Sequence, residues 1–347
     1  MKINFVVPST VLGGGIRVIF LYSNYLASKG HDVVVYVPML AYTNKRGVPN
    51  IKTSIANTFK RGTKVKWFDC KFKIQLAFAI KDSFIRDADV TIASAWYTAP
   101  DVYELSQSKG KKAYFIQDYE IWNQEKSIVD ATYKLNMNRI VITNTLKELL
   151  QTNFGVPSTV IYNGHDRNEY LHEEKIINKK KVIIMLCNTA NYKGGWQGIE
   201  ILERLYKKYQ TRIILFGVSK PTNLPDYFEF YEQPKREKLI NLYQQADICL
   251  FPSLQEAWGL TAIEAMANKC AVVGNNTGCL KELCTNGKEA LIVENFNYDE
   301  LELKAESLIN DEKLLLEIQN NGYELAKTLN WDESYKKIES VLFNITQ

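Results

Sequence analysis

The chain has 347 residues, 46% hydrophobic and 24% charged, and a formal net charge of +4. This composition is ordinary for a soluble globular protein, and no apolar run approaches the roughly 20 residues that a membrane-spanning helix needs. At roughly 100–200 residues per domain, the length predicts two domains.

The first residues, "MKINFVVPST", predict a strand, because their apolar run of three residues is too short for the core of a signal peptide. The six cysteines form no Cys-x-x-Cys pair, and Cys187 and Cys249 lie within apolar runs. We therefore expect reduced thiols and a cytoplasmic protein.

Strands and helices alternate along the first half of the chain. A glycine cluster at 13–15 precedes an amphipathic helix over 16–30, which ends on a glycine as a helix C-cap does. Strands are expected at 2–8, 31–38, 86–94, 113–117, 139–144 and 158–164. This alternation predicts a parallel sheet covered by helices.

The charged segment that follows has no core pattern, so we place a linker over 166–179. A second series of strands is expected at 182–188, 212–217, 248–253 and 270–275. We therefore predict an α/β chain with a first domain over 1–165 and a second over 180–330. A C-terminal helix over 331–347 is expected to pack back on the first domain.

The stretch "FPSLQEAWGLTAIEAMANK" holds two glutamates, Glu256 and Glu264. In one interpretation, Ser253 and Glu256 form a capping box and Glu264 lies on a solvated helix face. However, Gly259 is a poor interior helix residue, which favours a loop through Gly259 and a helix from about Leu260. The start of such a helix, at the carboxyl end of a strand, suits a phosphate. The two glutamates can then accept hydrogen bonds from ribose and sugar hydroxyls, so the stretch predicts a site for a nucleotide diphosphate-sugar.

The frame "PS..E.WGL...EAMA" resembles the donor motif of retaining family 4 glycosyltransferases, which have the GT-B fold. That fold has two Rossmann-like doubly wound domains facing each other across a cleft. Other elements that resemble the family follow its order: "GGGIRV" (13–18), "NGHD" (163–166), "YKGG" (192–195), "TGCLKEL" (277–283) and "NWDESY" (330–335). The resemblance covers nearly the whole chain. It implies metal-independent transfer of a sugar to a saccharide or lipid-linked saccharide, without a cofactor, in cell-surface polysaccharide synthesis.

The resemblance also implies roles for single residues. Lys193 would neutralise the donor diphosphate, Glu256 would hold the donor sugar and Glu264 would bind ribose. The implied catalytic residues are Glu256, Lys193 and Asp118. The implied donor-binding residues are Gly14, Gly15, Asn188, Lys193, Gln233, Glu256, Gly259, Leu260, Thr261 and Glu264. We expect the backbone near Gln233 to contact the base, and Asp118 to position the acceptor or the donor sugar.

Two departures from the family bear on these roles. Asn188 stands where the family usually has an arginine, which leaves open a non-catalytic GT-B-like subunit that binds nucleotide-sugar. The run "QDYE" (117–120) resembles a rhamnosyltransferase-like branch and points to a deoxysugar donor. A GT-B epimerase or phosphorylase is a further alternative. A dinucleotide-dependent oxidoreductase is disfavoured, because no Rossmann fingerprint follows the first strand.

Two other features have simpler interpretations. Asp87 and Asp89 form an Asp-x-Asp pattern, but Asp89 begins a strand as Asp247 does, so we predict no metal site. The segment "KRGTKVKWFDCKFK" (60–73) combines six basic residues with three aromatic rings. It is either a solvated face with packing rings or a patch that meets an anionic acceptor or the inner face of the membrane. No nucleic-acid partner is expected.

Overall fold

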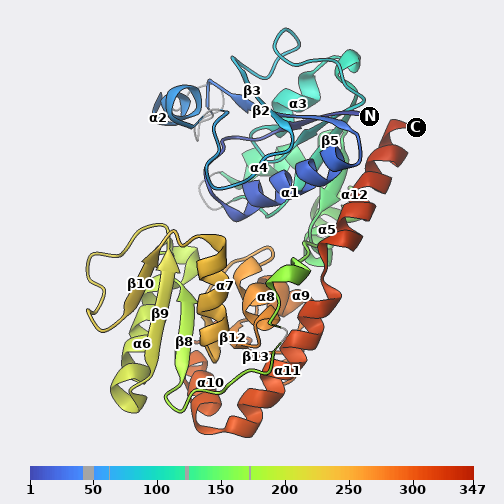
Figure 1. Cartoon of the computed structure of the whole chain (residues 1–347). Coiled ribbons are helices and arrows are strands. Elements are labelled where there is room, and N and C mark those ends of the chain that lie inside the picture. The colour runs from blue at the N-terminus through green and yellow to red at the C-terminus, as the bar shows by residue number, and fades with distance from the viewer. Residues whose placement is uncertain (42–50, 62, 122–124, 172) are drawn as a thin grey trace. The chain divides into compact units, whose positions relative to one another are not determined.

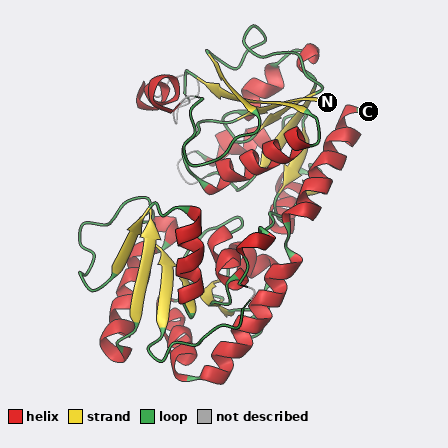
Figure 2. Cartoon of the chain, in the orientation of Figure 1, coloured by secondary structure: helices red, strands yellow, loops and turns green. Residues whose placement is uncertain are grey.

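The computed structural model describes residues 1–41, 51–61, 63–121, 125–171 and 173–347 (Figure 1). The chain forms two compact units. Unit 1 comprises residues 1–163 and 332–347, and unit 2 comprises residues 164–331. Each unit contains a parallel sheet with helices packed against it (Figure 2).

Unit 1 is built on a seven-stranded sheet in the order β3-β2-β1-β4-β5-β6-β7. Its strands are β1 (Lys2–Val6), β2 (Asp32–Pro38), β3 (Lys73–Ala77), β4 (Val90–Ala93), β5 (Lys111–Ile116), β6 (Asn138–Val141) and β7 (Thr159–Val160). Its helices are α1 (Gly14–Ser28), α2 (Ile51–Ile55), α3 (Ala99–Glu104), α4 (Lys126–Tyr133), α5 (Asn144–Phe154) and α12 (Trp331–Thr346), with a π-helical turn at Ala56–Arg61. Every residue of β4 is buried, as expected for a parallel strand covered on both faces.

Unit 2 is built on a six-stranded sheet in the order β10-β9-β8-β11-β12-β13. Its strands are β8 (Val182–Leu186), β9 (Arg212–Gly217), β10 (Glu229–Glu232), β11 (Ile248–Phe251), β12 (Ala271–Asn275) and β13 (Leu291–Val293). Its helices are α6 (Gly195–Tyr209), α7 (Arg236–Gln245), α8 (Leu260–Ala267), α9 (Gly278–Leu283), α10 (Tyr298–Asn310) and α11 (Glu312–Thr328). Buried aliphatic side chains of β8, β9, β11 and β12 form its core.

The two sheets share one topology. In each, the chain runs outward from a central strand to one edge, then returns to the other side of that strand. The reversal lies between β1 and β4 in unit 1, and between β8 and β11 in unit 2. Open α/β sheets bind ligands outside the carboxyl ends of the strands at such a switch point. The predicted pair of doubly wound α/β sheets is confirmed.

Asp89 and Asp247 occupy equivalent places in the two sheets. Each directly precedes the strand beyond the switch point and accepts a backbone hydrogen bond from the central strand. Lys2 N donates to Asp89 Oδ2 at 2.7 Å, and Val182 N donates to Asp247 Oδ2 at 2.8 Å. Asp87 instead pairs with Lys109 at 2.8 Å. Both members of the Asp-x-Asp pattern therefore have structural partners, and the described residues contain no cluster suited to a metal ion.

Replacing Asp247 with alanine is expected to destabilise unit 2. Asp247 is fully buried and also accepts hydrogen bonds from Asn178 Nδ2 at 3.0 and 3.1 Å. Removing the carboxylate leaves buried donors unpaired, which costs about 2–3 kcal/mol of the free energy of unfolding. Urea unfolding measures the loss, and the exposed Asp89→Ala is the matched control, with an expected cost below about 1 kcal/mol. If Asp247→Ala and Asp89→Ala lost the same free energy of unfolding, burial would not explain the effect of Asp247→Ala.

The segment 166–179, predicted to be a linker, lies within unit 2 instead. Leu171 N donates to Ala267 O at 3.0 Å. Lys175 Nζ donates to the carbonyl oxygens of Tyr243 and Gln244, at the end of α7, at 3.2 and 2.7 Å. The polar residues that resembled a solvated linker therefore satisfy carbonyl groups at a helix end, a role that lysine commonly takes.

The last helix, α12, continues from unit 2 into unit 1, to which residues 332–347 belong. Tyr335 stacks on Tyr25 of α1 with ring centroids 4.7 Å apart. Glu339 accepts hydrogen bonds from Tyr25 Oη at 3.0 Å and pairs with His31 at 2.8 Å. Within the part of the chain that the structure describes, no helix is both long enough and apolar enough to span a bilayer. All six cysteines are described and are free.

Candidate functional site

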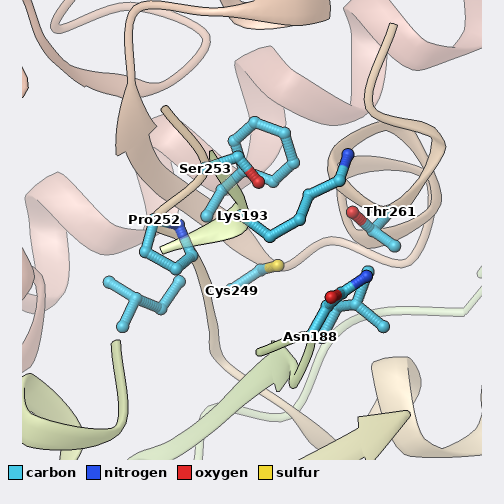
Figure 3. Close-up of a pocket in the computed structure, with 9 residues that line it drawn as sticks. Asn188, Lys193, Cys249, Pro252, Ser253 and Thr261 are labelled. Carbon is cyan, nitrogen blue, oxygen red and sulfur yellow. The ribbon is translucent and has the colours of Figure 1, made fainter. Parts of the chain in front are cut away.

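A pocket lies at the switch point of unit 2, at the carboxyl ends of β8 and β11 (Figure 3). Strand ends, the turn before α6 and the first turn of α8 all contribute to its wall. The lining residues are Leu186, Asn188, Lys193, Cys249, Leu250, Phe251, Pro252, Ser253 and Thr261. Three of the predicted donor-binding residues, Asn188, Lys193 and Thr261, therefore share one pocket.

Lys193 is placed by a tight turn that only glycine permits. The 3₁₀ turn Asn191–Lys193 is followed by Gly194, whose φ of +62° is in the left-handed region. A Cβ on Gly194 would lie 2.2 Å from Pro252 O, so the turn packs directly on the end of β11. Lys193 Nζ lies 2.7 Å from Glu256 Oε1, with side-chain exposures of 18% and 14%. The structure thus joins two predicted catalytic residues in a mostly buried ion pair.

The loop that carries Glu256 is not the start of a helix. Ser253 Oγ donates to Glu256 Oε1 at 3.3 Å, but the backbone N–H of Glu256, which a capping box would direct to Ser253, donates to Thr277 Oγ1 at 3.0 Å. Helix α8 begins only at Leu260. Gly259 precedes it with φ of +84°, and a Cβ there would lie 2.7 Å from a ring carbon of Phe251. The predicted loop through Gly259 and helix from Leu260 are confirmed.

The two helices that begin at the pocket, α6 and α8, have no side-chain cap, and neither do α7 and α9 of the same unit. Asn297 and Asp311 cap α10 and α11 with side-chain hydrogen bonds. In contrast, α6 and α8 begin after Gly194 and Gly259, which have no side chain to cap them. The first N–H groups of a helix have no intrahelical acceptor and carry a partial positive charge. The starts of α6 and α8 therefore suit an anion at the pocket.

Glu264 lies one turn further into α8 and does not line the pocket. It is only 5% exposed, because α8 packs between β11, β12, α7 and α11. Arg236 Nη1 donates to Glu264 Oε1 at 2.6 Å, and Tyr243 Oη donates to Oε2 at 3.3 Å. Burial disfavours the charge on Arg236, but Glu264 and Glu169 outweigh this effect and raise its pKa. Sequence reasoning missed Arg236, whose only signal was its place at the start of a helix.

Comparison with known proteins agrees with this geometry. Residues 166–325 match the family model described as "Glycosyl transferases group 1". An N,N'-diacetylbacillosaminyl-diphospho-undecaprenol alpha-1,3-N-acetylgalactosaminyltransferase of Campylobacter jejuni is 24% identical over 344 residues, with 89% of each chain covered. Anabaena HepE, solved with UDP, superposes with a TM-score of 0.74 at 16% identity, covering 99% of this chain and 100% of that one. Residues 166–325, a little under half of the chain, therefore match this glycosyltransferase family, and the whole chain has the GT-B fold.

Another relative is matched over a shorter stretch of the chain. An uncharacterised glycosyltransferase of Methanocaldococcus jannaschii is 25% identical over 240 residues. The match covers 67% of this chain and 62% of that protein. None of these comparisons bears on the rhamnosyltransferase-like branch, which stays a prediction.

Asn188 and Gln233 make hydrogen bonds with backbone groups. The exposed Asn188 accepts a hydrogen bond from Ala190 N through Oδ1 at 3.0 Å, so it shapes the turn after β8. Gln233 follows β10 with φ of +41°, and its Nε2 donates to Val218 O at 3.0 Å. Gln233 does not line the pocket. The contact with a base expected near Gln233 remains a prediction.

The remaining predicted residues belong to unit 1 and form a separate group there. Gly14 and Gly15 were expected in a loop, but they form the first turn of α1. Gln117 Nε2 donates to Gly15 O at 3.2 Å, and a Cβ on Gly15 would lie 3.1 Å from this nitrogen. Asp118 follows β5 and accepts a hydrogen bond from Tyr119 N at 2.7 Å. Gln117 thus joins the start of α1 to the carboxyl end of β5, directly beside Asp118 in the chain.

Glu120 is a functional candidate that sequence reasoning passed over. Its Oε2 accepts a hydrogen bond from Trp96 N, at the end of β4, at 2.6 Å. Burial raises the pKa of the Glu120 carboxyl to about 8, and nearby Asp118 adds to this effect. The only signal in the sequence was its place two residues after Asp118, in a run that follows a strand.

The free energy of unfolding of the protein is expected to fall between pH 5 and pH 8 because of Glu120. Its pKa rises on folding from an ordinary 4.5 to about 8, so the folded state holds a proton that the unfolded state releases. The protonated Glu120 carboxyl contributes its full stabilisation below pH 4.5, and this stabilisation is lost as the pH rises through the pKa of Glu120 in the folded state. Between pH 5 and pH 8, the free energy of unfolding of Glu120→Gln should fall by at least about 1 kcal/mol less than that of the wild type. The reason is that a difference of one pKa unit corresponds to about 1.4 kcal/mol.

Urea unfolding at pH 5 and pH 8 measures this difference. The exposed Glu148→Gln on α5 is the control and should decline as the wild type does. A Glu120→Gln variant with the wild-type decline would show that Glu120 does not hold its proton in the folded state.

The segment 60–73 has its aromatic rings turned to the protein. The rings of Trp67, Phe68 and Phe72 lie 5.4, 5.5 and 5.2 Å from that of Phe20 in α1. Trp67 Nε1 also donates to Thr10 O at 3.0 Å. The basic residues at 64, 66 and 71 are exposed, whereas residue 62 and the side chains at 60 and 61 lie outside the described residues. The rings therefore serve packing, whereas the described lysines face solvent together with Thr63 and Asp69.

Proposed function

We propose that this glycosyltransferase moves a sugar from a nucleotide diphosphate-sugar to a saccharide or lipid-linked saccharide, with retention at the anomeric carbon. The observation that carries the proposal is the Lys193–Glu256 ion pair beside the switch-point pocket of unit 2. The Lys193 ammonium group suits the diphosphate, and the Glu256 carboxylate suits the hydroxyl groups of the sugar. The uncapped starts of α6 and α8 support an anion between them.

The reaction we propose needs no nucleophile from the protein. The acceptor hydroxyl attacks the anomeric carbon on the face from which the diphosphate leaves, and the departing phosphate takes the hydroxyl proton. Negative charge then grows on the diphosphate, where Lys193 and the N–H groups that begin α8 stabilise it. Among the pocket's lining residues, all of which are described, Lys193 is the one cation. Since Asn188 supplies no charge, the proposal places most of this stabilisation on Lys193.

The Lys193–Glu256 pair must open at least partly when donor binds. An ammonium group has three donor hydrogens, so Lys193 can turn one or two of them from Glu256 to the diphosphate. Glu256 then has oxygens that accept hydrogen bonds from the sugar. Glu256 would thus be held beside the pocket before donor arrives, which reduces the entropy lost on binding.

The names of two relatives bear on the acceptor and on the location of the protein. The Campylobacter relative acts, by its name, on a diphospho-undecaprenol-linked sugar, and a further relative is a capsular polysaccharide biosynthesis glycosyltransferase of Staphylococcus aureus. We propose a cell-surface polysaccharide pathway and peripheral contact with the inner membrane face through Lys64, Lys66 and Lys71. Vesicles with anionic lipid should bind the protein more tightly than zwitterionic ones, and charge reversal at these lysines should remove the difference. Equal binding to both vesicles would contradict the contact.

A screen of nucleotide-sugars by thermal shift tests the donor. A ligand at a hundred times its dissociation constant stabilises the folded state by about 2.7 kcal/mol. UDP-sugars come first in the screen, because HepE is also solved with UDP-glucose. Transfer is then followed by NMR, which reports the configuration of the product. If no nucleotide-sugar stabilises the protein, the proposed function is wrong.

A non-catalytic nucleotide-sugar-binding subunit is the second candidate. The observation that favours it is Asn188, which leaves the pocket one cation short of the pattern that the resemblance implies. Such a subunit would bind the donor and show neither hydrolysis nor transfer. The same screen and assay therefore separate the two candidates.

A further inference from the structure

Arg236 lies between two carboxylates that come from distant parts of unit 2. Its Nη1 donates to Glu264 Oε1 at 2.6 Å, and its Nε donates to Glu169 Oε1 at 2.6 Å. Nη2 also pairs with Glu169 Oε2. The side chains of Arg236, Glu169 and Glu264 are 29%, 12% and 6% exposed. The three residues form one largely buried charged cluster beside the start of α7.

The contact with Glu169 fixes the direction of the contact with Glu264. A planar guanidinium that meets one carboxylate through two parallel hydrogen bonds has its plane and its remaining donors set. Glu169 is itself anchored, because it ends the 3₁₀ turn Arg167–Glu169 that Asp166 caps by accepting from Asn168 N at 2.9 Å. Nη1 of Arg236 is therefore a donor in a fixed place, directed at one oxygen of Glu264.

The two donors reach different oxygens of Glu264: Arg236 donates to Oε1 and Tyr243 Oη donates to Oε2. Each oxygen of a carboxylate can accept from more than one donor. Two neighbouring hydroxyl groups can bind such a carboxylate together, but only if its plane does not turn. Burying the Glu264 carboxylate would also cost considerable desolvation free energy if it had no cationic partner.

We propose that Arg236 is a positioning residue for ribose recognition. It holds the Glu264 carboxylate in the orientation that accepts hydrogen bonds from the ribose hydroxyls of the donor nucleotide. Glu169 acts behind it as the anchor. The inference rests on the proposed function, because it requires a ribonucleotide at Glu264.

The preference for ribose over deoxyribose tests this role directly. Calorimetry measures the dissociation constants of UDP, GDP and ADP and of their 2′-deoxy forms for the wild type and Arg236→Met. We expect the wild type to bind its preferred ribonucleotide at least about tenfold more tightly than the deoxy form, the usual effect of a hydrogen bond to a charged group. Arg236→Met should lower this ratio to about two or less, as Glu264→Gln should, while its affinity for the deoxy form changes little.

Two further variants distinguish a specific effect on ribose binding from a loss of folding. Arg212→Met removes another arginine–glutamate pair of unit 2, with Glu229, and should keep the wild-type ratio. Glu169→Gln leaves Arg236 in place but weakens its anchor, so it should lower the ratio even if Arg236→Met does not fold. The melting temperature of each variant is measured alongside.

The outcomes separate this inference from the function on which it rests. If the wild type binds none of the six nucleotides, both fail. If the wild type prefers the ribose form and Arg236→Met keeps that preference, only the positioning role fails. If Arg236→Met weakens both forms equally while it stays folded, Arg236 contacts another part of the nucleotide and the inference is overturned.

Discussion

Lys193→Met is expected to lower sugar transfer by about 10²–10³-fold while the protein stays folded. Lys193 is the one cation among the lining residues of the pocket, and its Nζ lies 2.7 Å from Glu256. Without it, the charge that grows on the leaving diphosphate has only backbone N–H groups to stabilise it. Removing one electrostatic stabiliser of a transition state typically has an effect of this size.

Initial rates of transfer at saturating acceptor measure this loss. Lys207→Met on α6 is the matched control, since Lys207 is exposed and pairs with Glu203 away from the pocket. Its rate should equal that of the wild type. A Lys193→Met enzyme with more than about a tenth of the wild-type rate would mean that another cation serves the diphosphate, because a main electrostatic stabiliser contributes more than tenfold.

The two glutamates are expected to respond differently to the same change. Glu256→Gln should lower transfer by about 10²-fold, with the dissociation constant of the nucleoside diphosphate within about threefold of the wild type. Glu264→Gln should instead raise that dissociation constant by about tenfold, since one hydrogen bond to a charged acceptor contributes about 1.5–3 kcal/mol. The reason is position: Glu256 lies beside Lys193 at the pocket, whereas Glu264 lies one turn into α8.

Calorimetry with the nucleoside diphosphate and transfer assays with the full donor separate the two effects. The exposed Glu317→Gln on α11 controls for the loss of one negative charge and should change neither quantity. The reverse pattern, with Glu256→Gln weakening the nucleotide and Glu264→Gln slowing transfer, would mean that the donor binds in the opposite direction.

The region around the two glutamates shows how far local reasoning reaches. Gly259 was predicted to separate a loop from a helix, and the structure gives it a left-handed φ of +84° directly before α8. The prediction succeeded because the cost of glycine in a helix and the period of the residues after it are local properties. The equivalence of Asp89 and Asp247 succeeded for the same reason, since each immediately precedes a short apolar strand.

The same region shows where local reasoning stops. Nothing near Glu264 in the chain predicts that Arg236 and Tyr243 bond to its carboxylate. The segment 166–179 was expected to be a linker, yet its polar side chains bond to α7 and to Asp247. In both cases the partners lie far along the chain, and a polar residue does not reveal whether water or a distant group will satisfy it.

The sequence by itself determined the alternation of strands and helices, the two doubly wound sheets and the turn that leads into α8. These features depend on backbone preference and on apolar spacing within a few residues. Only the tertiary structure decided that Lys193 pairs with Glu256 and that Arg236 joins Glu169 to Glu264. Such pairs form because the topology of the sheet brings strand ends and helix starts together. A sequence pattern that extends over a few residues does not predict contacts between residues far apart in the chain.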